Sequence, residues 1–243
     1  MIPQQVFREV RAFCRAHADA AQAKRWARYF TEGYDAYGVD YKDPEWTSLQ
    51  AAWADRLRGG PAAIWLDAGD LLVRTGKYEE ASFALRLAIT LEEHDSPETF
   101  ARLGGWFAGG IRNWGHTDVL CGDCLTRYLV RKVVPLKALI EWRDSPHKYQ
   151  RRAVPVALIG VLKTASSFQP LFRGIAPLMH DPERVVQQGL GWFLREAWKR
   201  QPAETEAFLL QYKDTCPRTI VQYATERMDA AGKARFKRAK AAR

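Results

Sequence analysis

The chain has 243 residues, of which 47% are hydrophobic and 27% charged, as in ordinary folded globular proteins. The net charge of +9 favours a polyanionic partner, nucleic acid first and an acidic membrane surface second. Four cysteines in so long a chain exclude a disulfide framework and favour a reducing, cytoplasmic compartment, and no apolar run is long enough to span a membrane.

Nearly every segment predicts a helix, because apolar residues recur at three- and four-residue steps between proline, glycine and aspartate joints. The predicted helices cover residues 3–14, 24–33, 44–58, 61–75, 79–94, 97–109, 113–125, 134–142, 149–164, 170–179, 182–200, 202–212 and 217–228. Pro155 inside one of them should kink it or shift its start. Strand-like alternation is nearly absent.

This rhythm of helices and short joints predicts antiparallel helix pairs stacked as a HEAT-like or armadillo-like α-solenoid. There is no exact repeat period, so the prediction rests on the rhythm alone. We expect a single domain over residues 1–231 and a basic tail over residues 232–243. The tail is either an electrostatic arm for phosphates or a frayed, solvated end.

The segment around Asp118 is the first candidate site. Asn113 is a good N-cap residue for the helix that follows it. One stripe of that helix holds Ile111, Trp114, Asp118, Cys121 and Leu125. A carboxylate on an apolar stripe is costly unless something polar meets it. Asp118 therefore lies at the wet edge of a half-exposed helix, pairs with a structural arginine, or serves a functional site.

The helix around Trp192 is the second candidate. Its inward stripe should be Val186, Leu190, Phe193 and Ala197. Trp192 instead shares a face with Gln188, Arg195, Glu196 and Lys199, where it would stack on a base or sugar or pack against the next repeat. Periodicity does not choose which of Arg151 and Arg152 turns inward. Cys121, Cys124 and His116 form only half of a zinc site, which favours structural cysteines and no metal.

Four motifs carry a resemblance to a known family: Asn113-Trp114-x3-Asp118, Arg151-Arg152-Ala153, Val186-Gln187-x3-Gly191-Trp192-x-Leu194-Arg195-Glu196 and Pro217-Arg218-Thr219-x3-Tyr223-Ala224-x-Glu226. In order and spacing they resemble the DNA alkylation repair family, the HEAT-like-repeat alkylpurine DNA glycosylases of the AlkD type. The resemblance runs from about Lys24 to Met228. It implies a right-handed, C-shaped solenoid whose basic concave face grips duplex DNA.

The resemblance also implies the chemistry. It implies a monomer that needs no cofactor and hydrolyses the N-glycosidic bond of cationic 3-methyladenine and 7-methylguanine lesions without a tight base-flipping pocket. Asp118 matches the catalytic aspartate, and Trp114 and Trp192 match the tryptophans that flank the lesion. Tyr29 matches a nearby tyrosine. Arg152 matches an arginine at the DNA backbone, with Arg151 fitting to within one residue. The other basic candidates for DNA contacts are Arg195, Lys199 and Arg218.

Two departures from the family pattern keep other functions open. Gly115-His116 follow the first tryptophan, where the family usually has an acidic or bulky residue. The loop at residues 40–44 lacks the usual arginine-rich helix start. The alternatives are a non-catalytic protein of the same fold that binds DNA structures, and a protein-interaction scaffold whose binding would be indifferent to DNA and only weakly dependent on salt.

Overall fold

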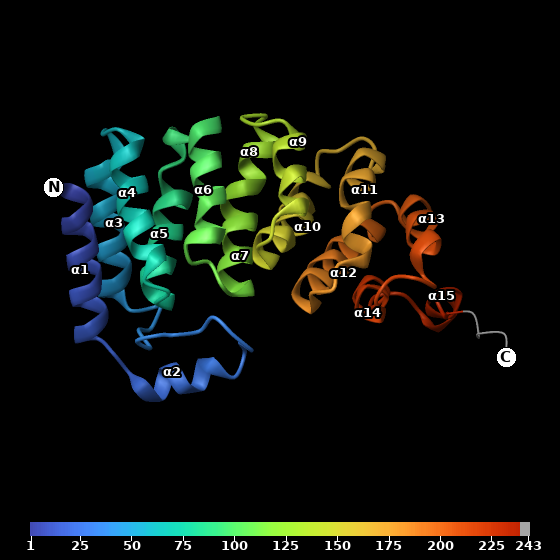
Figure 1. Ribbon diagram of the computed structural model, residues 1–243, viewed down its shortest axis with the longest axis horizontal. Coiled ribbons are helices and arrows are strands. Elements are labelled where there is room, and N and C mark those ends of the chain that lie inside the picture. The colour runs from blue at the N-terminus through green and yellow to red at the C-terminus, as the bar shows by residue number, and fades with distance from the viewer. Residues whose placement is uncertain (239–243) are drawn as a thin grey trace. The chain divides into compact units, whose positions relative to one another are not determined.

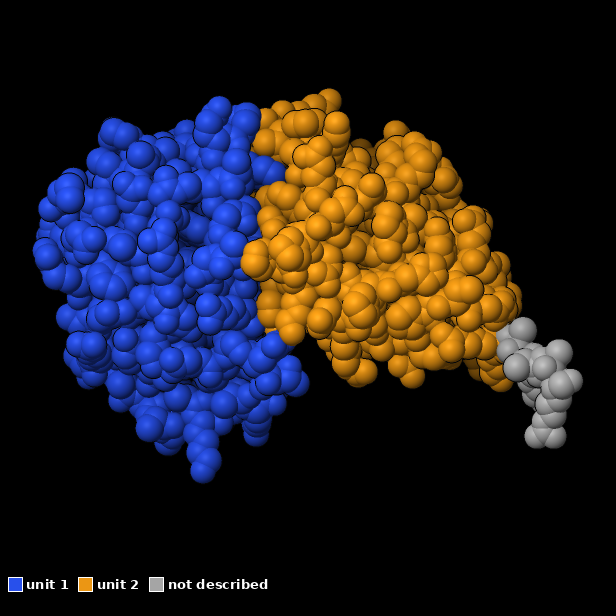
Figure 2. All heavy atoms as spheres, in the orientation of Figure 1, with its two compact units in different colours: residues 1–124 blue, residues 125–243 orange. Residues whose placement is uncertain are grey.

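The computed structural model describes residues 1–238 and is all-α (Figure 1). Over these residues there is no β-strand, only an isolated bridge between Asp35 and Lys77. The chain divides into two compact units, unit 1 at residues 1–124 and unit 2 from Leu125 onward (Figure 2). The sequence did not indicate this division, and each unit is described by itself below.

Unit 1 begins most of its helices where proline or a capping side chain predicts them. Asp43, Ser96 and Asn113 each accept a backbone hydrogen bond at the start of a helix. The helices are α1 (Ile2–Ala16), α2 (Ala20–Ala27), α3 (Pro44–Arg58), α4 (Ala62–Arg74), α5 (Tyr78–Thr90), α6 (Pro97–Gly109) and α7 (Trp114–Leu120), with a 3₁₀ turn at Glu92–His94. The predicted second helix was wrong at its end, because Tyr29 and Phe30 lie beyond α2.

The helices of unit 1 pack in two layers. In one layer α4 contacts both α1 and α6, and in the other α5 contacts both α3 and α7. From α3 to α7 each helix contacts the next but one, as stacked helix pairs do. α1 contacts α4 because α2 lies outside the layers. Trp53, Trp65 and Phe83 are fully buried between the layers. In Figure 1, α2 lies outside both layers and runs across the ends of their helices.

Beyond Leu120 the seventh helix does not continue as a regular α-helix. It widens into a π-helical turn at Cys121–Leu125 and resumes as α8 (Thr126–Val130). The rest of unit 2 contains α9 (Leu136–Ile140), α10 (Lys148–Val161), α11 (Gln169–Ile175), α12 (Arg184–Trp198), α13 (Pro202–Tyr212), α14 (Arg218–Ala224) and α15 (Ala230–Arg235), with 3₁₀ turns at Glu141–Asp144 and Ala176–His180.

Unit 2 is built around α12, which contacts both α10 and α14. The predicted inward stripe of α12 is confirmed, because Val186, Leu190, Phe193 and Ala197 are all fully buried. Pro155 lies inside α10, which begins at Lys148 as predicted to within a residue.

The first part of the predicted basic tail is folded. Phe236 is buried, and its carbonyl accepts a hydrogen bond from Arg218 at 3.3 Å. Arg235 pairs with Glu206 at 2.6 Å. Lys240 and Arg243 lie outside the described residues. Among the helices of residues 1–238, none is long and apolar enough to cross a lipid bilayer.

Candidate functional site

A cavity of about 520 Å³ lies in unit 1, between the α2 segment and the α3–α5–α7 layer. Its walls are mostly aromatic. The lining residues are Trp26, Tyr29, Phe30, Tyr34, Val39, Tyr41, Trp46, Tyr78, Glu79, Ser82, Trp114, Gly115, Asp118 and Val119. Three of the residues predicted from the sequence, Tyr29, Trp114 and Asp118, are therefore brought together at one cavity.

The first two turns of α7 place Trp114 and Asp118 at this cavity. Asn113 caps the helix as predicted, since its side-chain oxygen accepts the amide hydrogen of His116 at 2.8 Å. Its side-chain nitrogen donates to the carbonyl of Gly33 at 3.1 Å, and the indole of Trp114 donates to the carbonyl of Tyr29 at 3.1 Å. The start of α7 is thus fastened to the segment that follows α2.

The predicted stripe on this helix is divided between the core and the cavity. Ile111, Cys121 and Leu125 are fully buried, as expected for core positions. Trp114 is 41% exposed, and Asp118 is half-buried at the cavity wall. The costly carboxylate on an apolar stripe is explained by this position, because Asp118 faces a cavity and not the core.

Stacked rings connect Trp114 to the floor of the cavity. The ring of Phe30 stacks on Trp114 at 5.3 Å and on Tyr34 at 4.7 Å, and Tyr34 in turn lies 4.9 Å from Tyr78. Gly115 makes room for this arrangement, because a β-carbon there would lie only 3.3 Å from the Phe30 ring. The departure from the family pattern at Gly115 therefore has a packing reason.

Glu79 holds the loop that forms much of the cavity wall. Its carboxylate accepts backbone hydrogen bonds from Tyr37 at 2.9 Å, Gly38 at 2.7 Å and Val39 at 3.2 Å. Gly38 has a φ of +88°, a left-handed conformation that favours glycine. One buried side chain thus satisfies three consecutive amides of a loop that has no regular structure of its own.

His116, the second departure from the family pattern, is a buried structural residue. The side-chain amide of Asn113 donates to its Nδ1 at 3.0 Å, which leaves the proton on Nε2 to be donated to the carbonyl of Tyr78 at 3.1 Å. Burial lowers the pKa of His116 to about 4, against a smaller opposing effect of the Tyr78 carbonyl. The imidazole is therefore neutral near pH 7.

Because the pKa of His116 is lower in the folded chain than in the unfolded chain, protonation favours unfolding. The stability that His116 contributes should be complete above pH 6.5 and lost as the pH falls toward 4, by up to about 3 kcal/mol. Urea unfolding at about pH 7 and about pH 4.5 measures this loss. His116→Gln should be less stable at neutral pH but lose less on acidification, and an equal loss in both proteins would contradict the assignment.

Two basic side chains lie beside exposed aromatic rings at the cavity rim. The guanidinium of Arg28 lies 4.9 Å from the ring centre of Tyr29, and the ammonium of Lys42 lies 5.6 Å from that of Tyr41. The charged residues on the cavity wall are acidic, in contrast to the basic rim; they are Glu79 and Asp118. Positive charge at the rim and negative charge inside could receive a phosphate backbone and a cationic group, respectively.

The remaining predicted residues belong to unit 2. Arg152 is buried, and its guanidinium donates to the carbonyl of Val185 at 2.6 Å. Arg151 pairs with Asp181 at 2.6 Å and also donates to the carbonyl of Ser145 at 3.0 Å. Arg152 therefore ties α10 to the first turn of α12, and Arg151 ties it to Asp181 just before α12. Of the two, Arg152 is the one that turns inward, since it is buried and Arg151 is only half-buried.

Trp192 is half-buried on α12, and the basic residues on its face are engaged in ion pairs. Arg195 pairs with Glu226 at 2.5 Å, and Lys199 pairs with Glu196 at 2.9 Å. Burial alone would raise the pKa of Glu196, but hydrogen bonds from Lys199 and Arg195 lower it on balance. The predicted DNA contacts of these residues, and of Arg218, stay predictions.

The most specific sequence motifs of unit 2 also have a structural basis. A β-carbon at Gly191 would lie 2.4 Å from the Tyr223 side chain and 2.9 Å from the carbonyl oxygen of Ile220. A glycine here lets α12 and α14 approach closely. Gln187 donates to the carbonyls of Asp181 and Pro182 and so fixes the start of α12.

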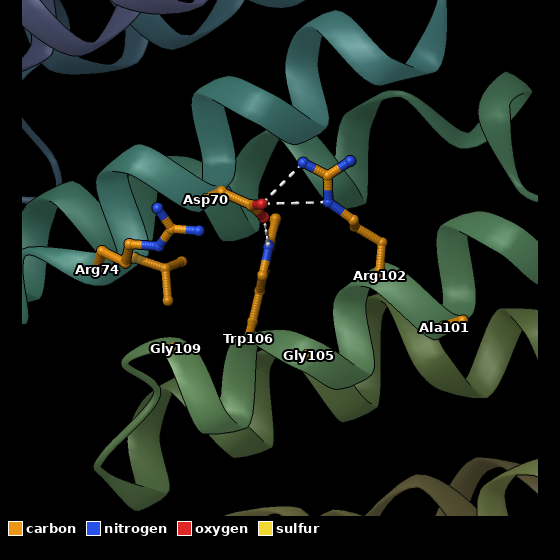
Figure 3. Close-up of a pocket in the computed structure, with 8 residues that line it drawn as sticks. Asp70, Arg74, Ala101, Arg102, Gly105, Trp106 and Gly109 are labelled. Atoms are coloured by element: carbon orange, nitrogen blue, oxygen red, sulfur yellow. Dashed lines mark hydrogen bonds and ion pairs between the residues drawn. The ribbon is translucent and has the colours of Figure 1, made fainter.

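A second cavity of unit 1, of about 290 Å³, lies between α4 and α6 (Figure 3). Asp70, Arg102 and Trp106 on its wall pair with one another. Asp70 accepts hydrogen bonds from Trp106 at 2.8 Å and from Arg102 at 2.7 Å, and Arg102 also reaches Asp67 at 2.6 Å. This arrangement joins two helices and presents no exposed aromatic ring, so we do not assign it a ligand.

Sequence analysis missed most of the cavity wall, notably Phe30, Tyr34, Tyr41, Tyr78 and Glu79. One signal was available, since six aromatic residues fall between Trp26 and Tyr41. A glycine-punctuated segment this rich in aromatic residues is more than a connection.

Comparisons with known proteins identify the family and the fold. The family model of the DNA alkylation repair enzymes matches residues 10–228. Among solved structures, one described as a predicted DNA alkylation repair enzyme from Enterococcus faecalis superposes with a TM-score of 0.75 at 13% identity, over 88% of this chain and 98% of that one. No curated protein matched the sequence. The structural similarity shows a shared fold, and the family match over most of the sequence shows that this chain belongs to the DNA alkylation repair enzyme family.

Proposed function

We propose that this protein is a DNA glycosylase that hydrolyses the N-glycosidic bond of cationic N3- and N7-alkylated purines in duplex DNA. The observation that carries the proposal is the position of Asp118. It lies one helical turn from Trp114, at the wall of an aromatic cavity, in a chain of the DNA alkylation repair enzyme family. A carboxylate beside π faces suits a reaction in which positive charge develops on a sugar.

The chemistry needs little besides a well-placed carboxylate. A purine alkylated at N3 or N7 already carries a positive charge, so it leaves as a neutral base when it takes the electron pair of the glycosidic bond. The deoxyribose becomes an oxocarbenium ion. An ionised Asp118 about 4 Å away would stabilise that charge by about 4 kcal/mol at an effective dielectric of about 20. Asp118 would then accept a proton from the water that attacks the sugar.

The other predicted residues have supporting roles in this proposal. The ring of Trp114 faces the developing cation and contributes roughly 0.5–2 kcal/mol. Trp192, on unit 2, is a separate candidate for ring contact with the DNA. Arg28 and Lys42 at the cavity rim of unit 1 contact the DNA backbone. On unit 2, Arg195, Lys199 and Arg218 are the candidates for backbone contacts, and buried Arg152 would act by holding α10 against α12. The net charge of +9 supports a duplex as the partner.

The test is release of free bases from methylated duplex DNA. The purified protein is incubated with the DNA, and 3-methyladenine and 7-methylguanine are measured by liquid chromatography and mass spectrometry. We expect release of both bases and one abasic site for each base released. Binding to undamaged duplex is measured in parallel between about 50 and 200 mM salt, where it should weaken steeply.

The two other functions predict different results. No release together with salt-dependent duplex binding would overturn the glycosylase proposal in favour of a non-catalytic DNA-binding protein. No release together with no duplex binding would favour a protein-interaction scaffold.

A further inference from the structure

A basic cleft of about 370 Å³ lies in unit 2 between α14 and α15 (Figure 1). It shares no residue with the aromatic cavity of unit 1, so the proposed chemistry at Asp118 leaves it unexplained. The lining residues are Arg218, Val221, Gln222, Thr225, Glu226, Lys233 and Lys237.

The cleft is a formed part of the fold, because the segment that follows α14 is held in place. Phe236 is buried, and its carbonyl accepts a hydrogen bond from Arg218 at 3.3 Å. The guanidinium of Arg238 donates to the carbonyl of Cys216. The lysines of this segment therefore lie on a folded part of the chain and not on a frayed end.

The cations of the cleft differ from their neighbours in having no acidic partner. Close by, Arg235 pairs with Glu206 at 2.6 Å. Among residues 1–238, Lys233 and Lys237 form no ion pair, and both are exposed. Arg218 donates to a carbonyl, which leaves its positive charge uncompensated. Three positive charges thus remain available to a ligand at one place.

The one acid of the cleft does not cancel these charges. Glu226 pairs with Arg195 at 2.5 Å, so a cation from outside the cleft compensates it. Lys233 and Lys237 are one turn apart, and the amide of Lys237 donates to the carbonyl of Ala234 at 3.2 Å to continue the turn of α15. Like charges at this spacing repel each other and cost stability. Their concentration at a folded cleft indicates an anionic ligand.

The donors of the cleft suit a phosphate group. The planar fork of Arg218 can bind two phosphate oxygens, and the two lysines add point charges. Gln222 is exposed and offers a neutral amide donor. The lining residues include no aromatic ring on which a base could stack. Cations without such a ring bind the backbone of a nucleic acid and do not read its bases.

We propose that the α14–α15 cleft binds the phosphate backbone of duplex DNA, as an anchor apart from the aromatic cavity. The family model matches residues 10–228, so Lys233 and Lys237 lie beyond the matched segment. The proposal goes beyond the proposed function, because binding here needs duplex DNA but neither a lesion nor Asp118. The cleft therefore raises the affinity for damaged and undamaged duplexes alike and takes no part in bond breaking.

The salt dependence of duplex binding tests the cleft. Lys233→Gln combined with Lys237→Gln removes two charges from exposed side chains, so the fold should be kept. Fluorescence anisotropy measures binding to methylated and undamaged duplexes between about 50 and 200 mM salt. Each phosphate contact adds about 0.9 to the slope of log affinity against log salt, so the slope should fall by about 2 and the affinity by about 10-fold or more.

Two further double variants control for net charge. Lys137→Gln with Lys163→Gln removes the same charge from exposed lysines of unit 2 outside the cleft, and it should leave the slope nearly unchanged. Lys233→Arg with Lys237→Arg should bind as tightly as the wild type. An equal fall of the slope in both glutamine variants would overturn the proposal, because net charge alone would then explain the loss.

Cross-linking locates the backbone on the protein. The native cysteines within residues 1–238 are all buried, so a cysteine introduced at the exposed Gln222 is the reactive thiol. A series of duplexes carries an activated mixed-disulfide tether on one phosphate at a time. Gln222→Cys should exchange with the tether at one or two adjacent phosphates. Gln211→Cys, exposed on α13, is the matched control and should select none. Even cross-linking along the duplex by Gln222→Cys would contradict a bound backbone.

The cleft and the glycosylase reaction can fail separately. A protein that releases bases, but whose Lys233→Gln/Lys237→Gln variant keeps the wild-type slope, loses the cleft proposal alone. An inactive protein whose slope falls by about 2 in this variant loses the proposed function alone. If the variant instead lost binding to phosphatidylserine vesicles while duplex binding stayed unchanged, the cleft would serve a membrane surface and the DNA proposal would be wrong.

Discussion

Asp118→Asn should lower the rate of 7-methylguanine release from methylated duplex DNA by roughly 100-fold or more. The substitution keeps the size and polarity of the side chain but removes its charge. An amide cannot stabilise an oxocarbenium ion by Coulomb attraction, and it cannot accept a proton from water at neutral pH. Single-turnover rates with protein in excess measure the bond-breaking step, and duplex binding measured alongside should change little.

Asp123→Asn is the matched control for this experiment. Asp123 is an exposed aspartate in the π-helical turn that follows α7, only five residues beyond Asp118. Its variant should keep the wild-type rate, which would separate loss of the catalytic charge from a general loss of negative charge on this helix. If Asp118→Asn released 7-methylguanine within about 10-fold of the wild-type rate, Asp118 would not be the charge-stabilising group.

Glu79→Ala should destabilise unit 1 by roughly 3 kcal/mol or more and open the loop that forms the cavity wall. The reason is the loss of one acceptor for three consecutive amides, at Tyr37, Gly38 and Val39. A buried donor left without a partner costs about 1–3 kcal/mol. Hydrogen–deuterium exchange should show the three amides losing protection, and urea unfolding gives the change in stability.

Glu79→Gln provides a graded comparison. Its side-chain oxygen can still accept from Gly38 and Val39, but its amino group would face the amide of Tyr37. We therefore expect the free energy of unfolding of Glu79→Gln to lie between those of the wild type and Glu79→Ala. Hydrogen exchange should increase mainly at the amide of Tyr37. If all three amides were as well protected in Glu79→Ala as in the wild type, ring packing alone would hold the loop in its conformation.

The sequence predicted most helices because proline and capping residues define their starts. α3 and α13 begin at the predicted residues Pro44 and Pro202, and Asn113 caps α7 as expected. The second helix was wrong because Tyr29 and Phe30 continue the helical spacing, yet contacts with α7 hold them in a loop. The π-helical turn at Cys121–Leu125 was also missed, since a single wide turn barely alters side-chain periodicity.

The candidate site was predictable only where its residues share one helix. Trp114 and Asp118 are four residues apart, so spacing alone placed them on one face. The cavity that gives them a context draws residues from α2, its following loop, α3, α5 and α7, and periodicity says nothing of such distant contacts. Glu79 is one such residue. An acid in the first turn of a helix is expected from the helix dipole alone, so nothing in the sequence indicates its bonds to the distant loop.

In this cavity the acidic residues and most of the exposed aromatic rings come from different parts of unit 1. α5 and α7 carry Glu79 and Asp118 and belong to a packed layer, so few substitutions are tolerated there. Trp26 belongs to α2, which lies outside both layers in Figure 1, and Tyr29 and Tyr41 belong to the chain that follows α2. Exchange of residues 26–41 between relatives would therefore change the cavity lining while the carboxylate stays in place. A library directed at this segment would vary the cavity without rebuilding the core.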